Sequence, residues 1–262
     1  MAIRDLNVSV RVWLSRTLVC LGYVDQARLR RDEALADARP LGPFNLAYAL
    51  GHAGYGVNWA VEGAKSAPTM LRCADELLAI ANEQGFPVWI GIGSFVRGWC
   101  LSMVGQATAG LTPMLQGIAT YRATGCNVGI PFFLTVLAEA YAMMGQPEEG
   151  LNQLAEAEKM LEATTQERWA EAEMHRMRGT LLLSMRKHAE AEDSLHQAIA
   201  VARSQSAKFW ELRGAVDLAR LWHDRGERTE ARDFLAPIYG WFTEGFDTPV
   251  LQDAKALLDQ LA

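Results

Sequence analysis

Apolar residues recur at three- and four-residue intervals along most of the chain. The stretches "PFFLTVLAEAYAMMG" (131–145) and "ERWAEAEMHRMRGTLLLSM" (167–185) show this spacing most clearly. The spacing gathers apolar side chains on one face of a helix. Nowhere does a useful length of sequence alternate between apolar and polar residues, as a half-buried strand would. The pattern therefore predicts an all-α protein.

Short hairpin-like segments recur at a nearly constant distance. They are "LGYVDQA" (21–27), "VGQATAG" (104–110), "MGQPEEG" (144–150), "MRKHAEA" (185–191) and "RGERTEA" (225–231), with "AKSAPTM" (64–70) as a degenerate copy. The second residue of each segment serves as a marker. The markers are Gly22, Lys65, Gly105, Gly145, Arg186 and Gly226, spaced by 43, 40, 40, 41 and 40 residues. Such a period is typical of helical repeat proteins.

Small residues occupy two fixed places around the markers. Seven residues before each marker stand Ser15, Asn58, Gly98, Ala138, Gly179 and Ala219. Five residues after it stand Ala27, Met70, Gly110, Gly150, Ala191 and Ala231. Small side chains let two helix axes approach closely. Each copy is therefore predicted to be a helix, a tight turn and an antiparallel helix.

The repeat defines an α-solenoid in one domain, residues 1–262. About six hairpins of about 40 residues are expected at 4–42, 43–85, 86–125, 129–165, 168–206 and 208–246, before a capping helix at 248–262. Glycines suited to ending the second helix follow four copies, at Gly42, Gly85, Gly125 and Gly245. Prolines suited to starting the next helix stand at Pro43, Pro87, Pro131 and Pro249.

The chain closes on an aromatic segment, "PIYGWFTEGFDTPVLQDAKALLDQL". We expect the second helix of the sixth repeat to run from about Arg228 to Thr243, with Phe246 packed back on its last turn. Thr248 is expected to cap a final helix that covers the apolar face of the last repeat. The alternative is that the aromatic side chains beside Asp247 form a ligand site.

Composition and charge restrict the partners and the compartment. Apolar residues make up 50% of the chain, which allows a sizeable core, and the net charge of −6 argues against non-specific nucleic-acid binding. Charged residues break the apolar run at the N-terminus, so neither a signal peptide nor a membrane span is expected. Four well-separated cysteines suggest free thiols in a cytoplasmic protein: Cys20, Cys73, Cys100 and Cys126.

The sequence offers no convincing catalytic or cofactor motif. The fragment "EGAKSAP" (62–68) echoes a phosphate-binding loop, but Ala64 stands where the Walker pattern requires glycine before Lys65. The five histidines form no i, i+4 pair and no HExxH motif, and there is no GxSxG elbow. We therefore predict a protein that is not an enzyme and has no cofactor and no metal.

A partner is expected along the first helix of each repeat. Its inner positions are those thirteen, ten, six and three residues before each marker. They give the candidate groove residues His52, Tyr55, Trp59, Phe95, Trp99, Glu139, Arg176, Arg213 and Arg220, and also Phe132, Glu173 and His223. An aromatic half followed by a charged, partly basic half suits a peptide with an apolar anchor and an acidic end. The aromatics could equally be core between neighbouring helices.

The spacing of small residues resembles that of the tetratricopeptide repeat, although that repeat has about 34 residues. A closer resemblance covers nearly the whole chain. The stretches "EQGFPVWIGIGSFVRGW", "YRATG", "LAEAYAMMGQPEEGL" and "LAPIYGWFTEGFDTPVLQDAKALL", with "LGYVDQA" and the 167–183 segment, are similar to the C-terminal helical repeats of large bacterial signalling proteins. Those proteins combine a class III adenylate/guanylate cyclase or regulator domain with an AAA-type ATPase. The resemblance implies a sensory or scaffolding arm without the catalytic domains.

The resulting hypothesis is a cytoplasmic protein–protein interaction module, the regulatory arm of a bacterial signalling protein. It would bind a peptide or a partner domain, such as a cyclase or ATPase domain of the same system, and neither nucleic acid nor membrane. One alternative is a sensor that binds a small ligand in the aromatic half. Another is a homo-oligomeric scaffold, because no capping helix is visible before the first repeat, whose exposed face could pair with a second copy.

Overall fold

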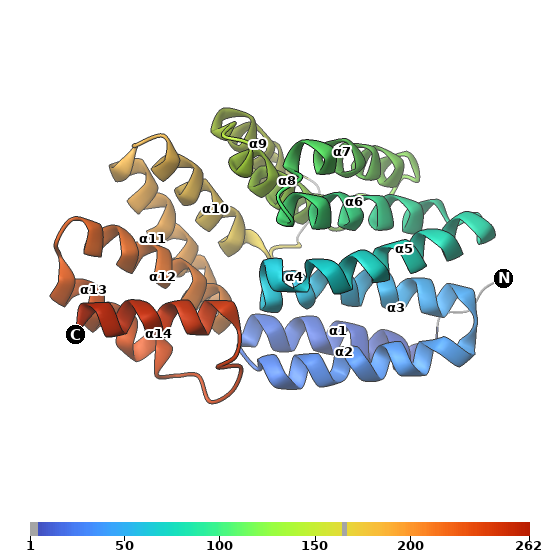
Figure 1. Cartoon of the computed structure of the whole chain (residues 1–262), viewed down its shortest axis with the longest axis horizontal. Helices are drawn as coiled ribbons and strands as arrows, with labels where there is room; N and C mark the ends of the chain where they lie inside the picture. The colour runs from blue at the N-terminus through green and yellow to red at the C-terminus, as the bar shows by residue number, and fades with distance from the viewer. Residues whose placement is uncertain (1–4, 164–166) are drawn as a thin grey trace. The chain divides into compact units, whose positions relative to one another are not determined.

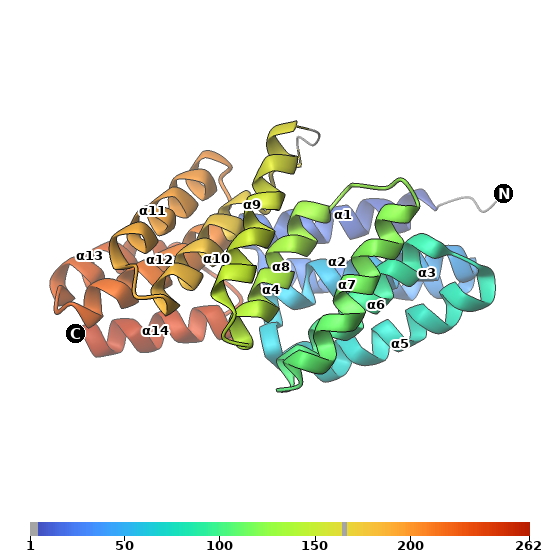
Figure 2. The same cartoon turned by 90° about the horizontal axis from the view of Figure 1, so that it is seen from above.

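The computed structural model describes residues 5–163 and 167–262, without the side chains of residues 53–55, and every regular element in these ranges is helical. Contacts divide the chain into two compact units. The first extends to Ile130 and the second begins at Pro131, with residues 20–23 grouped in the second. Each unit is a series of helical hairpins (Figures 1 and 2). That all of them form one domain remains a prediction.

Unit 1 contains the first three predicted repeats. Its helices are α1 (Leu6–Leu21), α2 (Val24–Ala38), α3 (Pro43–Gly56), α4 (Asn58–Glu62), α5 (Ala67–Gln84), α6 (Pro87–Met103) and α7 (Ala107–Ala123), with short 3-10 helices η1 (Arg39–Leu41) and η2 (Gly63–Ser66). The first and third repeats are the expected hairpins, α1 with α2 and α6 with α7.

The second repeat departs from the predicted hairpin. Its first helix stops at Gly56, resumes for only five residues as α4, and passes through η2 into α5. Glycine favours helix less than other residues except proline, and Gly63 has a positive φ of 51° that ends α4. Lys65, at the marker position, lies within η2 rather than in a left-handed turn. The turn predicted at 64–70 is therefore replaced by a 3-10 segment.

Helices α6 and α7 approach each other closely at paired glycines. A Cβ atom on Gly117 would lie 2.6 Å from the carbonyl oxygen of Gly91, and one on Gly91 would lie 2.9 Å from that of Gly117. A Cβ on Gly98 or on Gly110 would collide with the other residue's carbonyl oxygen. The close approach predicted from the two small-residue positions is therefore confirmed in this repeat, since Gly98 and Gly110 occupy those positions.

Unit 2 contains three further hairpins and the final helix. Its helices are α8 (Ile130–Met143), α9 (Pro147–Ala163), α10 (Glu171–Ser184), α11 (His188–Ser204), α12 (Lys208–Asp224), α13 (Arg228–Tyr239) and α14 (Pro249–Leu261). A Cβ on Gly150 would lie 3.2 Å from the carbonyl oxygen of Ala138, and one on Gly179 would lie 3.2 Å from that of Ala191. The same pair of small positions thus joins the two helices of the fourth and fifth repeats.

The turn between the two helices needs a residue with positive φ at the marker. Gly105, Gly145 and Gly226 supply it with φ values of 84°, 69° and 87°. Arg186 adopts the same conformation with φ of 60°, although it has a side chain. The left-handed conformation costs a non-glycine residue about 1–2 kcal/mol. The fifth turn therefore keeps the geometry of the others at a conformational cost.

Replacing Arg186 with glycine is expected to raise the free energy of unfolding by about 0.5–1 kcal/mol, because the strain removed exceeds the extra chain entropy of glycine. Urea unfolding followed by circular dichroism measures the change. The reciprocal control is Gly145→Arg at the equivalent turn, which has no atom within 4 Å of a built Cβ. It should lose a similar amount. If both variants shift stability in the same direction, the conformational explanation is wrong.

The closing segment forms a capping helix as predicted, but α13 ends earlier than expected. It stops at Tyr239, not near Thr243, and Gly240 is its C-cap, with its N–H donating to the Ala236 carbonyl oxygen at 2.9 Å. Thr248 caps α14, accepting a hydrogen bond of 3.4 Å from the Leu251 amide. Helix α14 packs against α12 and α13 and buries Leu251, Ala254, Leu257 and Leu261.

The aromatic side chains of the closing segment divide between core and surface. Phe242 is buried, whereas Trp241 and Phe246 are 38% and 49% exposed. Phe246 was expected to pack back on the last turn of α13. Its ring does lie 6.1 Å from that of Tyr239, but half of its surface is open to solvent. The side chains that cover the last repeat are therefore mainly those of α14.

Candidate functional site

A charged network joins the first helices of the fifth and sixth repeats. It consists of Glu173 and Arg176 on α10 and of Arg213, Asp217 and Arg220 on α12. Glu173 accepts hydrogen bonds from Arg176 Nη2 at 2.6 Å and from Arg213 Nη2 at 2.9 Å. Arg176 also donates from Nη1 to Asp217 Oδ2 at 2.6 Å. Arg220 lies 3.6 Å from the other Asp217 oxygen.

Three of the candidate groove residues therefore lie in one charged network, and their role in a groove stays a prediction. Arg176, Arg213 and Arg220 stand at inner positions of α10 and α12, and Glu173 stands at another. Three guanidinium groups face two carboxylates, which leaves one net positive charge in the network.

The members of the network differ in how far their side chains are exposed to solvent. The Glu173 side chain is fully buried, and the side chains of Arg176 and Arg213 are only 11% and 14% exposed. Arg220, in contrast, is 50% exposed. Burial alone would raise the pKa of Glu173, but the charges and hydrogen bonds of Arg176 and Arg213 outweigh it and hold that pKa below its usual range. Glu173 is thus a fixed anion that positions two arginines, and it is unsuited to proton transfer near neutral pH.

An aromatic row lies at one end of the network. The ring centroid of Trp169 is 4.7 Å from that of Phe132 and 6.4 Å from that of Trp210. The Arg213 guanidinium lies 5.8 Å from the centroid of the Trp210 ring. Phe132 and Trp210 are buried, while Trp169 is partly exposed. Unit 2 by itself therefore places a partly exposed indole beside Trp210, whose ring lies near the Arg213 guanidinium of the network.

The candidate residues of unit 1 lie mostly in the core. Trp59, Phe95 and Trp99 are 4%, 1% and 2% exposed. This burial favours the alternative in which they pack between helices, and a binding role for them stays a prediction. His52 is half-buried, with its ring 4.6 Å from the Tyr48 ring.

Three further candidates, Tyr55, Glu139 and His223, stay predictions. The side chain of Tyr55 lies outside the described residues. Glu139, on α8, is half-buried. His223, also expected on the inner face, lies 3.4 Å from Asp224 at the end of α12.

The inner-position pattern does not include Asp217 or Trp169. Asp217 could have been found by searching the sequence for opposite charges one repeat apart. Glu173 and Arg213 are 40 residues apart, and Arg176 and Asp217 are 41 residues apart. Opposite charges one repeat apart are placed side by side by a solenoid. Trp169 precedes α10, so a pattern written for helical positions omits it.

Other chemistry is limited in the described part of the chain. All four cysteines are free thiols, and burial, as the largest effect, raises the pKa of Cys100 to about 12. Among the described residues no group of histidine, cysteine and acidic side chains is arranged to hold a metal ion. Within the same residues, no helix combines the length and the apolar character that crossing a membrane requires.

Comparison with known proteins shows the fold. No protein-family model matches the chain, and no curated protein matches it, so no catalytic family is shown. Apo RapI matches it with a TM-score of 0.63 and 10% identity, over 98% of this chain and 87% of RapI. NprR in complex with its cognate peptide NprX matches with a TM-score of 0.64 and 15% identity, over 99% of this chain and 72% of NprR.

A third similar structure is a signal transduction ATPase with numerous domains and a tetratricopeptide repeat sensor, from Pyrococcus horikoshii. Its TM-score is 0.54 at 14% identity, and the match covers 97% of this chain but only 38% of that protein. These likenesses confirm that the chain is a tetratricopeptide-like helical repeat protein.

Proposed function

We propose that the chain is a non-catalytic regulatory module that binds a peptide, or an extended segment of a partner protein, on the first-helix face of unit 2. The observation that carries the proposal is the half-exposed Arg220 at the edge of a network whose other arginines are already held. A preorganised cation with unused donors is suited to a carboxylate of a ligand. The similar protein NprR is known in complex with a cognate peptide, which supports this kind of partner.

The contacts within the network indicate which arginine is available to bind the partner. Arg176 and Arg213 are engaged by Glu173 and Asp217, so they act as supports rather than as contacts. The acidic group of a peptide would bind Arg220, and an apolar side chain would pack on the exposed part of Trp169. This arrangement keeps the expected combination of an apolar anchor and an acidic end within unit 2.

The wider system is part of the same proposal. The module would be the sensory or regulatory arm of a cytoplasmic bacterial signalling protein, passing partner binding to a cyclase or ATPase domain of that system. A repeat sensor attached to an ATPase in the Pyrococcus horikoshii protein supports such an arrangement. The resemblance of the C-terminal stretches to repeats that follow cyclase and ATPase domains points in the same direction.

Self-association through the first repeat is a second candidate, because α1 carries an exposed apolar stripe. Leu6, Val10, Trp13 and Leu14 are 74%, 55%, 43% and 40% exposed, and their spacing places them on one helical face. Such a stripe is an expected interface for a second copy.

A random twelve-residue peptide library displayed on phage tests the peptide proposal. Enriched peptides are expected to share an acidic residue near an apolar one, and a synthetic peptide of that sequence should bind at least tenfold more weakly to Arg220→Glu. The control is Arg232→Glu on α13, which is 48% exposed and outside the network. No enrichment, or enrichment of peptides that bind Arg220→Glu and wild type equally, would overturn the proposal.

A further inference from the structure

Helix α12 reaches the surface of unit 2 along one narrow stripe. Over residues 209–219 every residue of the helix is buried except Arg213 and Asp217, which are half-buried. Arg220 and Asp224 follow and are exposed. The steps of four, three and four residues place these four side chains, here called the α12 stripe, on one face of the helix. A ligand that lies along α12 would therefore meet the helix on the α12 stripe.

An apolar surface lies at the N-terminal end of the α12 stripe. The Arg213 guanidinium is 5.8 Å from the centroid of the Trp210 ring, which lies 6.4 Å from that of Trp169. Trp210 is buried, but Trp169 is partly exposed, and its Nε1 donates a hydrogen bond of 2.9 Å to Glu167. The hydrogen bond and the ring contact fix the orientation of the Trp169 indole. An apolar side chain of a ligand would pack on its exposed part.

One position of the α12 stripe is suited to a ligand carboxylate. Asp217 accepts a hydrogen bond of 2.6 Å from Arg176 and lies farther from Arg220, at 3.6 Å. Arg220 therefore keeps N–H donors and half of its surface for a ligand. Asp217 precedes Arg220 by one turn and Asp224 follows it by one turn, so a carboxylate shifted along the helix in either direction meets a negative charge. The two acids thus confine a bound carboxylate to Arg220.

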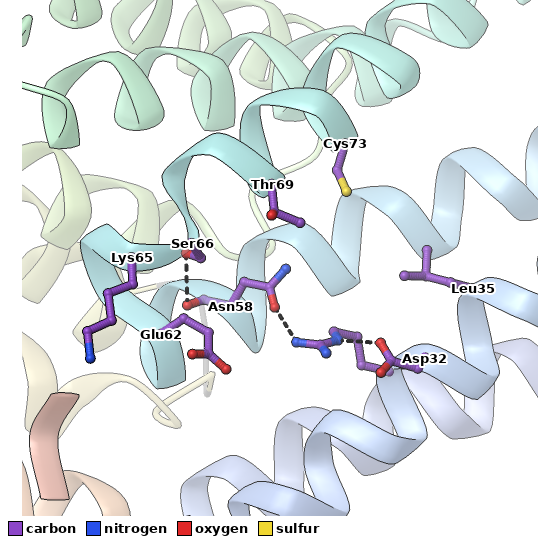
Figure 3. A pocket seen from close by; sticks show the side chains of 9 residues that line it. Asp32, Leu35, Asn58, Glu62, Lys65, Ser66, Thr69 and Cys73 are labelled. Carbon is purple, nitrogen blue, oxygen red and sulfur yellow. Dashed lines mark hydrogen bonds and ion pairs between the residues drawn. The ribbon is translucent and has the colours of Figure 1, made fainter. Parts of the chain in front are cut away.

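The polar pocket of unit 1 provides a contrast, because its charges are balanced. It lies between α2 on one side and α4, η2 and α5 on the other (Figure 3). The charged lining residues are two cations and two acids: Arg31, Lys65, Asp32 and Glu62. Arg31 is only 16% exposed and donates hydrogen bonds to both Asp32 and Asn58. Arg220 is half-exposed, and its neighbouring acid is held by another arginine, so Arg220 is better placed than Arg31 to bind a carboxylate.

The distance between the apolar surface and Arg220 limits the sequence of a ligand. Trp210 and Arg220 are ten residues apart on α12, which corresponds to about 15 Å along the helix axis. An extended peptide advances about 3.3 Å per residue, so two of its side chains would reach both places when they are four or five positions apart. Between these places the stripe offers Arg213 and Asp217, whose charges are already paired. The intervening positions of the peptide are therefore not selected by charge.

We infer that the peptide face of unit 2 recognises two side chains at a fixed separation: a large apolar or aromatic residue, and an aspartate or glutamate four or five positions away. The inference rests on the proposed function and adds a length requirement to it. The apolar side chain packs on Trp169, the carboxylate binds Arg220, and the residues between them follow the α12 stripe. A peptide with the same two residues at another separation makes one of these contacts but not both.

A phage-displayed library with defined separations tests this inference on the full chain. Each twelve-residue peptide contains one phenylalanine and one glutamate, one to nine positions apart in either order, among random uncharged polar residues. After selection, separations of four and five are expected to be at least fivefold enriched over their share of the starting library. The preference should disappear with Arg220→Glu and persist with Arg232→Glu, which lies on α13 outside the network.

Exchanging two charges on the α12 stripe tests the distance directly. Arg220→Asp combined with Asp224→Arg keeps the net charge and moves the cation by four residues, or about 6 Å along α12. Both positions are exposed, so the variant should fold as the wild type does. Its preferred separation should lengthen by about two positions, to six or seven, because the cation lies farther from Trp169.

Two results would overturn the fixed separation and leave the peptide proposal intact. One is that peptides bind through Arg220 at every separation alike, and the other is that the exchanged variant keeps the wild-type preference. No enrichment, or enrichment that Arg220→Glu does not reduce, would overturn both the fixed separation and the proposed function. If the exchanged variant does not fold, the separation profiles of the wild type and of Arg220→Glu still decide.

Discussion

Replacing Gly110 with leucine is expected to lower the free energy of unfolding by about 3 kcal/mol or more, the upper end of the range for overpacked interiors. A Cβ on Gly110 would collide with the backbone carbonyl of Gly98 and lie 3.0 Å from the backbone nitrogen of Ser102. Backbone atoms of a packed helix cannot rotate away as a flexible side chain can. Helices α6 and α7 would have to separate along their length.

The better helix propensity of leucine does not rescue this variant. It is worth about 0.8 kcal/mol relative to glycine, well below the cost of the collision. The matched control is Ala109→Leu, at the neighbouring and exposed position of α7. It adds a comparable side chain to solvent and should change the stability by less than about 0.5 kcal/mol. Urea unfolding of both variants measures the difference. Equal stability would show that α6 and α7 are not closely packed at this point.

The same glycines show how much of the fold a single sequence contains. A period near 40 with small residues at two places locates the hairpins, because only small side chains permit that distance between helix axes. The period locates the fifth turn even at Arg186, which adopts the left-handed conformation although it carries a side chain. The repeat period therefore locates turns that the conformational preferences of single residues would not predict.

Local exceptions to the repeat could not be predicted in the same way. The break at Val57 depends on the balance between helix propensity and packing around α4. The segment "AKSAPTM" aligns with hairpin turns, although its first three residues belong to the 3-10 helix η2 and the other four begin α5. The sequence places the end of α13 too late because two glycines can serve as its C-cap, and Gly245 lies five residues beyond the actual C-cap, Gly240. Both exceptions arise where two weak preferences compete.

The candidate site shows a similar limit. The sequence predicts a charged inner side on α10 and α12, but spacing does not tell which charges pair within the chain. Arg176 pairs with Glu173 and Asp217, and Arg213 pairs with Glu173. A ligand contact by either arginine stays a prediction. Whether a charge is satisfied depends on side-chain contacts one repeat away, which become visible only with the structure.

Replacing Glu173 with alanine is expected to lower the free energy of unfolding by about 3–5 kcal/mol, the cost of removing one partner from a buried ionic cluster. Glu173 is fully buried and accepts hydrogen bonds from two arginines, which would then lack their main counterion. Glu173→Gln keeps the shape but not the charge, so it should lose less than the alanine variant. The exposed Glu162→Gln on α9 is the control and should be near neutral.

The pH dependence of the free energy of unfolding distinguishes the contribution of the Glu173 charge from the contribution of its packing. The charges and hydrogen bonds of Arg176 and Arg213 hold the folded-state pKa of Glu173 below its ordinary value of 4.5. Its stabilising contribution is therefore complete above the unfolded-state pKa and is lost as the pH falls through the folded-state pKa. Between pH 7 and the acid range, wild type should consequently lose more stability than Glu173→Gln, and the two unfolding curves should converge as the pH falls below 4.5.

A double-mutant cycle locates the partner of this charge. Arg213→Gln alone should also destabilise unit 2, because Glu173 keeps only Arg176, whereas Glu173→Gln with Arg213→Gln should cost less than the sum of the single changes. Strict additivity, with parallel pH profiles for wild type and Glu173→Gln, would mean that the network contributes packing but no electrostatic stability. The half-exposed Arg220 would then lack the rigid support that makes it a preorganised contact for an acidic peptide.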